Sequence, residues 1–84
     1  MKNKHTPNPK TVGHNISIAR KQQKMSVEEL ARKVNMRVSY INDIENDTLT
    51  DVPADILQRI ARTLGTTIAN LAGVPSRMRK DGYL

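Results

Sequence analysis

Two helical patterns with almost no chain between them constrain this sequence most. Within residues 26–45, apolar side chains recur at helical spacing, stop near Asn35 and then resume. Helices joined by so short a link must cross closely. That crossing requires a small side chain, then a residue that tolerates positive φ, then branched apolar residues facing back. Ala31, Asn35, Ile41 and Ile44 meet these requirements in that order, which predicts a helix-turn-helix motif.

The remaining apolar pattern predicts three further helices and an all-α fold. No stretch alternates in the manner of a strand, and no internal repeat is present. Ser26 and Glu29 form a capping-box pattern, Asp51 and Pro53 offer an N-cap and an early proline, and Gly65 is a natural stop. We expect five short helices at about residues 11–23, 26–35, 37–45, 51–64 and 67–72.

Length and composition limit the chain to one small domain. It has 84 residues and no Cys, so disulfides are excluded and a reducing compartment fits. No apolar run approaches the roughly 20 residues of a membrane span, and the N-terminus lacks the apolar core of a secretory signal. We therefore expect a cytoplasmic protein with a flexible basic arm at 1–10, a folded domain at 11–74 and a basic tail at 75–84.

Positive charge is concentrated in the termini and the front half. The chain carries +6 overall, with +3 in residues 1–10, +4 in residues 20–37, −3 in residues 38–76 and +2 in residues 77–84. Such a distribution suggests a polyanionic partner, of which nucleic acid is the simplest. The alternative is that the charge serves solubility only.

The chain resembles the XRE family, the phage Cro and repressor type of helix-turn-helix protein. The resemblance implies a five-helix bundle, commonly dimeric on double-stranded DNA, whose third helix enters the major groove. The implied function is a sequence-specific transcriptional regulator, most simply a repressor. The resemblance is carried by Ile16, Arg20, Ser26, Glu29, Leu30, Ala31, Ile41, Ile44, Glu45, Asn46, Pro53, Leu57, Ile60, Ala61, Leu64, Gly65 and Leu71.

The resemblance also assigns a structural role to Arg20. It implies an ion pair with Glu45 that ties the first helix to the end of the third; the alternative is that Arg20 touches phosphate. Two positions depart from the family pattern. Val27 replaces a common polar residue after the cap, and Asp47 replaces a frequent glycine, which puts the geometry of that turn in question.

Base-reading candidates follow from matching positions on the third helix. Asn42 can pair with adenine through two hydrogen bonds, Ser39 can donate or accept, and Val38 can contact a thymine methyl. Asp43 can accept from a cytosine amino group or disfavour wrong sites, and Arg37 can reach phosphate or guanine. For each of them the alternative is an ordinary solvated helix face.

Phosphate contacts and a dimer interface are expected elsewhere. Ser26 and Asn46 match phosphate-positioning sites, through backbone amides and short side chains, and Lys10 can reach the DNA backbone from the basic arm. A dimer interface is expected around the fifth helix and the tail, at Ile68, Leu71 and Val74.

No pattern in the chain indicates catalysis. His5 and His14 lack the neighbours of a metal site, Glu28 and Glu29 mark a helix start, and no phosphate loop or zinc spacing is present. We expect no enzyme activity, cofactor, metal or small-molecule substrate. The alternative to a DNA-binding regulator is a protein-interaction module of the same fold, such as an antitoxin or the partner of a regulator, which Asp43 and Val27 keep open.

Overall fold

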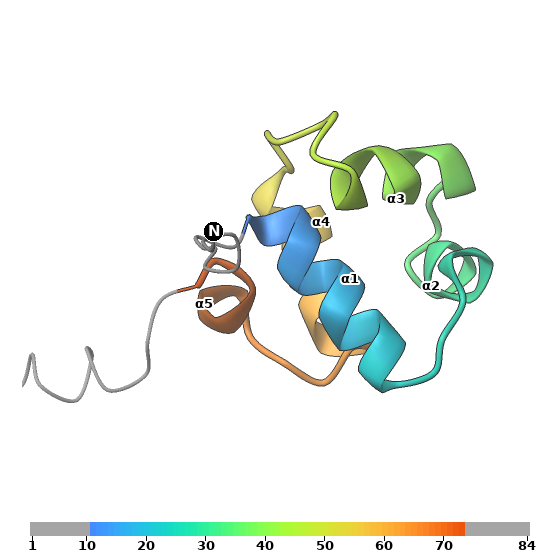
Figure 1. The fold of residues 1–84 in the computed structure, drawn as a ribbon, viewed down its shortest axis with the longest axis horizontal. Coiled ribbons are helices and arrows are strands. Elements are labelled where there is room, and N and C mark those ends of the chain that lie inside the picture. Colours follow the sequence, from blue (N-terminus) through green and yellow to red (C-terminus); the bar gives the residue numbers. More distant parts are fainter. Residues whose placement is uncertain (1–10, 74–84) are drawn as a thin grey trace, which may run out of the picture.

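The computed structural model describes residues 11–73 as five helices and the segments that join them (Figure 1). The predicted all-α fold of five helices is confirmed, and this range contains no strand. Lys10, Val74, the arm at 1–10 and the tail at 75–84 lie outside the described residues. The helices are α1 (Val12–Gln22), α2 (Val27–Lys33), α3 (Val38–Glu45), α4 (Ala54–Thr63) and α5 (Ile68–Leu71).

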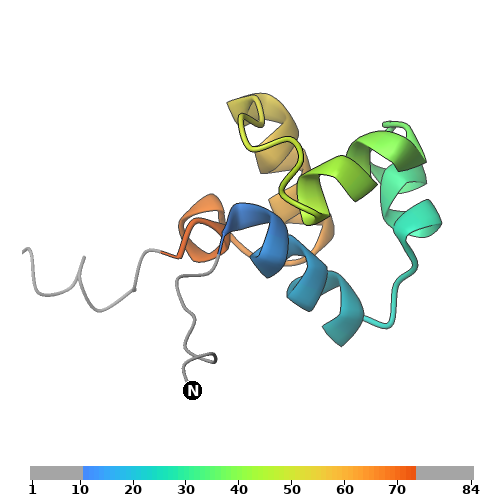
Figure 2. The same ribbon diagram turned by 45° about the horizontal axis from the view of Figure 1, so that its top comes forward.

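A single apolar core receives side chains from all of these helices. Ala31 is 1% exposed at the place where α2 and α3 meet, as the spacing predicts. Figure 2 shows α2 and α3 joined by their short turn on one side of the molecule, with α5 on the opposite side. The buried apolar residues are Ile16, Leu30, Ala31, Val34, Ile41, Ile44, Ile60, Ala61, Leu64 and Leu71.

Every helix in this range is followed, two positions after its last residue, by a residue with positive φ. In the turn between α2 and α3, Asn35 has a φ of 61°, and the Met36 amide donates to the Ala31 carbonyl at 2.9 Å. This pattern of backbone bonds satisfies carbonyls that the helix itself leaves free. Asp47 adopts a φ of 64°, so it holds the conformation that a glycine would take there. The other such residues are Lys24, Gly65 and Gly73.

The observed N-cap matches the sequence prediction at α2 but not at α4. Ser26 caps α2, because its Oγ accepts the Glu29 amide hydrogen at 3.0 Å. The prediction that Asp51 caps α4 is wrong, since the N-cap is Pro53 and it makes no side-chain cap bond. A cap at Asp51 would require Val52 to be helical. A residue before proline disfavours that conformation, so the helix starts after the proline.

Side chains from neighbouring helices satisfy carbonyls at three helix ends, which the sequence did not predict. Asn15 Nδ2 donates to the Leu71 carbonyl at 2.8 Å, tying α1 to α5. Gln23 Nε2 donates to the Leu64 carbonyl at 3.1 Å, and Arg59 Nη1 donates to the Val34 carbonyl at 3.0 Å. Each bond supplies a donor to an otherwise unpaired carbonyl and fixes one helix against another.

Gly13 allows α1 to approach the end of α3 at backbone distance. A Cβ built at Gly13 would lie 1.8 Å from the Ile44 carbonyl oxygen and 2.9 Å from Asp47 Oδ1. No side chain fits there unless the two helices separate. The residue therefore sets the spacing between α1 and the last turn of α3.

Arg20 on α1 ties α1 to the end of α3 through an ion pair. Its Nε donates to Glu45 Oε2 at 2.7 Å and its Nη2 donates to Glu45 Oε1 at 2.9 Å, so the pair is bidentate. Its Nη1 donates to the Met25 carbonyl at 2.7 Å, in the link between α1 and α2. The Arg20 and Glu45 side chains are only 10% and 8% exposed, which makes the pair largely dry. The arrangement is the one that the resemblance implies, and it leaves Arg20 turned away from solvent.

The pKa of Arg20 is raised, chiefly by its hydrogen bond to Glu45, with smaller contributions from the charges of Glu45 and Glu28, while burial lowers it. A raised pKa stabilises the fold at every pH below the ordinary arginine value. That contribution is lost only as the pH rises through the still higher folded value. Arg20 therefore stays charged throughout the range in which proteins are normally studied.

Replacing Gly13 with alanine should destabilise the fold, against the usual trend. In an exposed helix interior this change stabilises by up to about 1 kcal/mol. Here the added methyl group overlaps the Ile44 carbonyl oxygen, so we expect a loss of about 1–3 kcal/mol in the free energy of unfolding. Urea denaturation measures it, with His14→Ala on the exposed side of α1 as the control. A Gly13→Ala protein more stable than wild type would contradict the close approach.

Replacing one partner of the Arg20–Glu45 pair should destabilise the fold more than replacing both partners with apolar residues. Glu45→Gln leaves a buried arginine without its carboxylate, and we expect a loss of about 3 kcal/mol. Arg20→Met combined with Glu45→Leu should recover much of that loss, because no charge then remains buried. Thermal and urea unfolding of the single and double variants measure the coupling, with Gln22→Ala as a surface control. Additive effects of the two changes would argue against the pair.

Candidate nucleic-acid interface

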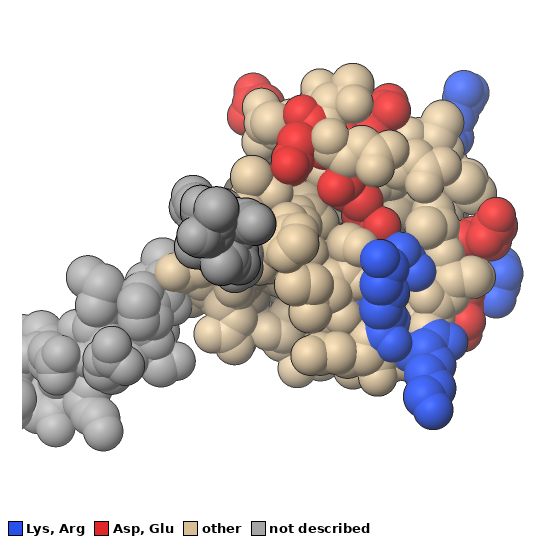
Figure 3. Space-filling model, in the orientation of Figure 1, with Lys and Arg blue, Asp and Glu red and all other residues tan. Residues whose placement is uncertain are grey.

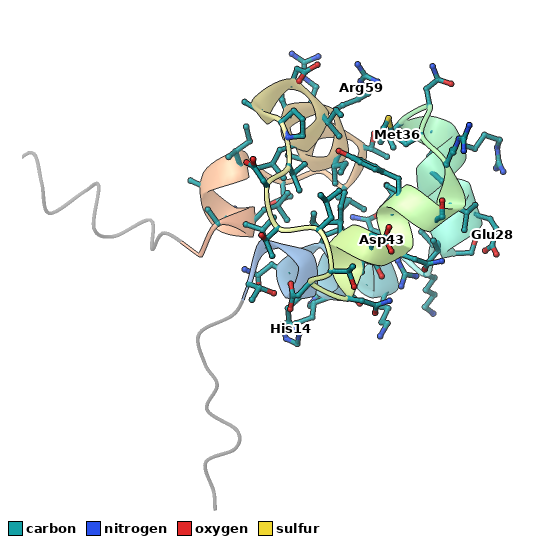
Figure 4. All side chains as sticks on the ribbon, turned by 90° about the horizontal axis from the view of Figure 1, so that it is seen from above. His14, Glu28, Met36, Asp43 and Arg59 are labelled. Carbon is teal, nitrogen blue, oxygen red and sulfur yellow. The ribbon has the colours of Figure 1, made fainter. Side chains whose placement is uncertain are left out.

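The helix α3 has one buried face and one open face. Ile41 and Ile44 are at most 1% exposed and anchor the helix to the core. On the other side Val38 is 36% exposed, which is unusual for a large apolar residue in this fold. Figure 4 looks onto α3 from above, with Asp43 labelled on it. The exposed side chains are those of Arg37, Val38, Ser39, Asn42 and Asp43, which are all five base-reading candidates.

The start of α3 is open to an anion. Arg37 is its N-cap but makes no side-chain cap bond, and the first turn contains no acidic residue. The positive end of the helix dipole and the Arg37 guanidinium therefore lie together at the exposed end of the open face. By contrast, α2 begins with a side-chain cap and with Glu28 and Glu29 in its first turn.

The structure narrows how Ser26 and Asn46 can contact phosphate. Both are exposed, but Ser26 Oγ already accepts the Glu29 amide hydrogen. The Asn46 amide donates to the Asn42 carbonyl at 2.9 Å, and the Asp47 amide donates to the Ile44 carbonyl at 3.1 Å. The Asn46 amide hydrogen is therefore already used by a helix-terminating bond. Only the side chain of Asn46 remains free to reach a ligand.

Burial within the fold accounts for three further residues near the motif or on α5. Tyr40 is partly buried and packs against the core. Val27 is also partly buried there, which accounts for an apolar residue after the Ser26 cap. Leu71 is 2% exposed inside the monomer, so the prediction that it forms a dimer contact is wrong. Ile68 is partly exposed and remains accessible.

Charge divides the surface around α3. Acidic side chains gather across the upper part of the molecule, over α3 and the segment leading to α4 (Figure 3). Residues 43–55 contain five acids and no Lys or Arg, although Glu45 is neutralised by Arg20. Most basic side chains in this view lie lower, over the end of α1 and the start of α2, and one lies at the upper right (Figure 3). A polyanion would be attracted to that region and to the start of α3, and repelled from the segment after α3.

Other kinds of site find little support in the described residues. Within residues 11–73, no three His, Asp or Glu side chains gather as metal ligands. A pocket of about 140 Å³ lies between the start of α1 and the segment after α3, lined in part by Gly13, Ile44, Leu49 and Val52. Its single carboxylate, Asp47, has no catalytic partner among the lining residues. No helix in this range has the length and apolar character to cross a membrane.

Comparison with known proteins agrees with this geometry. The helix-turn-helix family model matches residues 16–71, which include all of α2, α3 and α4. The immunity repressor protein of Bacillus phage phi105 is 31% identical over 71 residues, covering 84% of this chain and 49% of the repressor. The transcriptional regulator SinR of Bacillus subtilis is 27% identical over 73 residues, covering 87% of this chain and 66% of SinR. The chain thus spans about half to two thirds of these relatives' lengths.

Solved structures share the fold. SinR, the master regulator for biofilm formation, in complex with DNA has a TM-score of 0.70 at 28% identity, covering 73% of this chain and 97% of that one. SinR in complex with the SinI protein has a TM-score of 0.71 at 25% identity, covering 83% of this chain and 73% of that one.

The fold also occurs inside an enzyme. Hydroxypropylphosphonic acid epoxidase from S. wedmorenis has a TM-score of 0.68 at 28% identity, covering 73% of this chain but only 32% of the enzyme. The fold alone therefore does not fix a function, which must come from the residues on its surface. The matching family model and the arrangement of α2 and α3 together show that this chain belongs to the helix-turn-helix family.

Proposed function

We propose that this protein binds double-stranded DNA at a defined sequence and regulates transcription, most simply as a repressor. The observation that carries the proposal is the open face of α3, which presents Arg37, Val38, Ser39, Asn42 and Asp43 while Ile41 and Ile44 hold the helix to the core. An α-helix with exposed polar groups fits the major groove. The likeness to SinR, which has been solved in complex with DNA, supports this use of the fold.

Each exposed residue of α3 then has a chemical role. Asn42 pairs with adenine, Ser39 adds a single hydrogen bond, and the Val38 side chain covers a thymine methyl. Arg37 lies at the positive end of the helix, where phosphate or guanine is favoured. Asp43 accepts from a cytosine amino group or disfavours other bases, because a carboxylate near a carbonyl or phosphate oxygen is repelled.

Affinity is expected from groups outside this face. Residues 20–37 carry +4, and the Ser26 and Asn46 side chains are exposed near either end of the motif. Lys10 belongs to a segment with three lysines and no acid, which adds attraction to a polyanion. Phosphate contacts of this kind hold a protein in register without reading sequence.

A homodimer on a palindromic site is the simplest assembly. Two copies related by a two-fold axis read two half-sites and double the contact area. Ile68 on α5 is exposed enough to contribute to such an interface. The side of the molecule that carries α5 lies away from α2 and α3 (Figure 2), so pairing there leaves α3 free.

A second function is favoured by the acidic segment at residues 43–55. Four of its carboxylates have no arginine or lysine partner among the described residues, so this surface suits a basic protein better than DNA. SinR has been solved in complex with the SinI protein, which supports a protein partner for a chain of this fold. Such a partner would make the protein an interaction module, such as an antitoxin or the partner of a regulator.

Changing Asn42 and Ser39 to alanine should remove specificity while keeping the fold. Loss of a bidentate amide–adenine pair costs about 1–3 kcal/mol of discrimination against wrong bases. A site is first selected from random duplexes with the full-length protein. Binding of the Asn42→Ala and Ser39→Ala proteins to that site and to a scrambled duplex is then compared by fluorescence anisotropy.

Gln22→Ala, on the exposed side of α1, is the matched control and should bind like wild type. We expect the two α3 variants to lose affinity for the selected site but not for the scrambled one. Equal loss on both duplexes would assign these residues to phosphate contact. Selection that yields no preferred sequence would refute the proposed function.

Wild-type binding should weaken steeply with salt. The logarithm of the association constant is expected to fall linearly with the logarithm of salt concentration, by about 0.9 for each phosphate contacted. Titrations between low and physiological salt measure the slope. A flat salt response, together with a stoichiometric protein partner that co-purifies from cells, would favour the interaction module instead.

A further inference from the structure

Lys24 is an exception among the helix ends. Five residues of the described range have positive φ at these turns, and four of them are Asn35, Asp47, Gly65 and Gly73. Asn, Asp and Gly are the residues that tolerate this conformation best. Lys24 adopts a φ of 58° without that tolerance. The sequence therefore keeps a lysine where a glycine would make the fold more stable, and strained positions of this kind often serve function.

The hydrogen bonds next to Lys24 link it to the last turn of α3. Arg20 Nη1 donates to the carbonyl of Met25, the residue after Lys24, at 2.7 Å. The other two nitrogens of the same guanidinium donate hydrogen bonds to the Glu45 carboxylate. The link that carries Lys24 is thereby tied through Arg20 to the last turn of α3, and the Lys24 side chain is exposed.

The charges around Lys24 leave its ammonium free. Within residues 11–73 the ion pair between side chains is Arg20–Glu45, so no carboxylate of this range pairs with Lys24. Figure 3 shows basic side chains over the end of α1, below the acidic ones over α3. The α3 helix itself contains Asp43 and Glu45 but no Lys or Arg, and Arg37 precedes it. Phosphates beside the second half of α3 would therefore find no cation on that helix.

We propose that Lys24 contacts a DNA phosphate flanking the second half of α3, and that this contact is why a lysine occupies a position suited to glycine. The inference rests on the proposed function, since it assumes that α3 lies in the groove. Lysine acts on phosphate as a point charge, so the contact supports affinity and register but reads no base.

Three substitutions separate charge from backbone strain. K24Q removes the positive charge but keeps a side chain at a position with positive φ. K24G removes the charge and the backbone strain, and K24R keeps the charge and the strain. We expect K24Q and K24G to weaken binding to the selected and scrambled duplexes alike, with the salt slope reduced by about 1. A single lost contact corresponds to about an eightfold loss at 0.1 M salt. K24R should bind like wild type.

Only K24G should become more stable than wild type while it binds DNA less tightly. K24G should lower the unfolding equilibrium constant about fivefold, because glycine adopts this conformation freely. K24Q should unfold like wild type. A protein that becomes more stable yet binds DNA less tightly is an outcome that a purely structural lysine does not produce.

Arg62→Gln, an equal loss of charge on the last turn of α4 and outside residues 20–37, is the matched control. It should leave the salt slope at the wild-type value. Wild-type affinity and salt slope in K24Q would overturn the inference while leaving the proposed function intact. Equal losses in K24Q and Arg62→Gln would overturn it too, because they would indicate only the general electrostatic field. Absence of DNA binding by the wild type would remove the proposed function itself.

Discussion

The orientation of α3 depends on one guanidinium group. Arg20 reaches Glu45 on the last turn of α3 with two nitrogens and the Met25 carbonyl with the third. One side chain on α1 therefore fixes the link to α2 and the end of α3 together. Because the pair is nearly dry, neither partner can be lost without leaving a charge buried. Gly13 works with it, since the absence of a side chain lets the Ile44 backbone come close.

The open face of α3 follows from this anchoring. A helix of only eight residues cannot remain rigid by itself, so its exposed side chains are positioned by what holds its buried side. Ile41 and Ile44 fill the core, the turn at Asn35 sets where the helix begins, and Arg20 holds its last turn. Polar groups can then be presented to a groove with little loss of order on binding. The surface charge also favours an approach of a polyanion from the side that precedes α3, because acidic residues are concentrated after α3 and basic residues before it.

Sequence reasoning succeeded where the information is local. Ala31, Asn35 and the two isoleucines of α3 were predicted from spacing, and the structure confirms their burial and the positive φ of Asn35. It failed where a local rule met a competing one. Asp51 is a good cap in isolation, but Pro53 restricts the residue before it and moves the helix start. The base-reading roles of the α3 residues remain predictions, because exposure alone does not identify what they contact.

The sequence by itself determined the helices, their order and the residues that face the core, since periodicity and turn chemistry act within a few positions of the chain. It also supplied the resemblance on which the Arg20–Glu45 pair was expected. Only the tertiary structure decided that Gly13 admits a backbone carbonyl, that Arg59 closes the end of α2, and that Leu71 is buried within one monomer. These facts join residues distant in sequence, and no local pattern encodes which carbonyl or which cavity a side chain will meet.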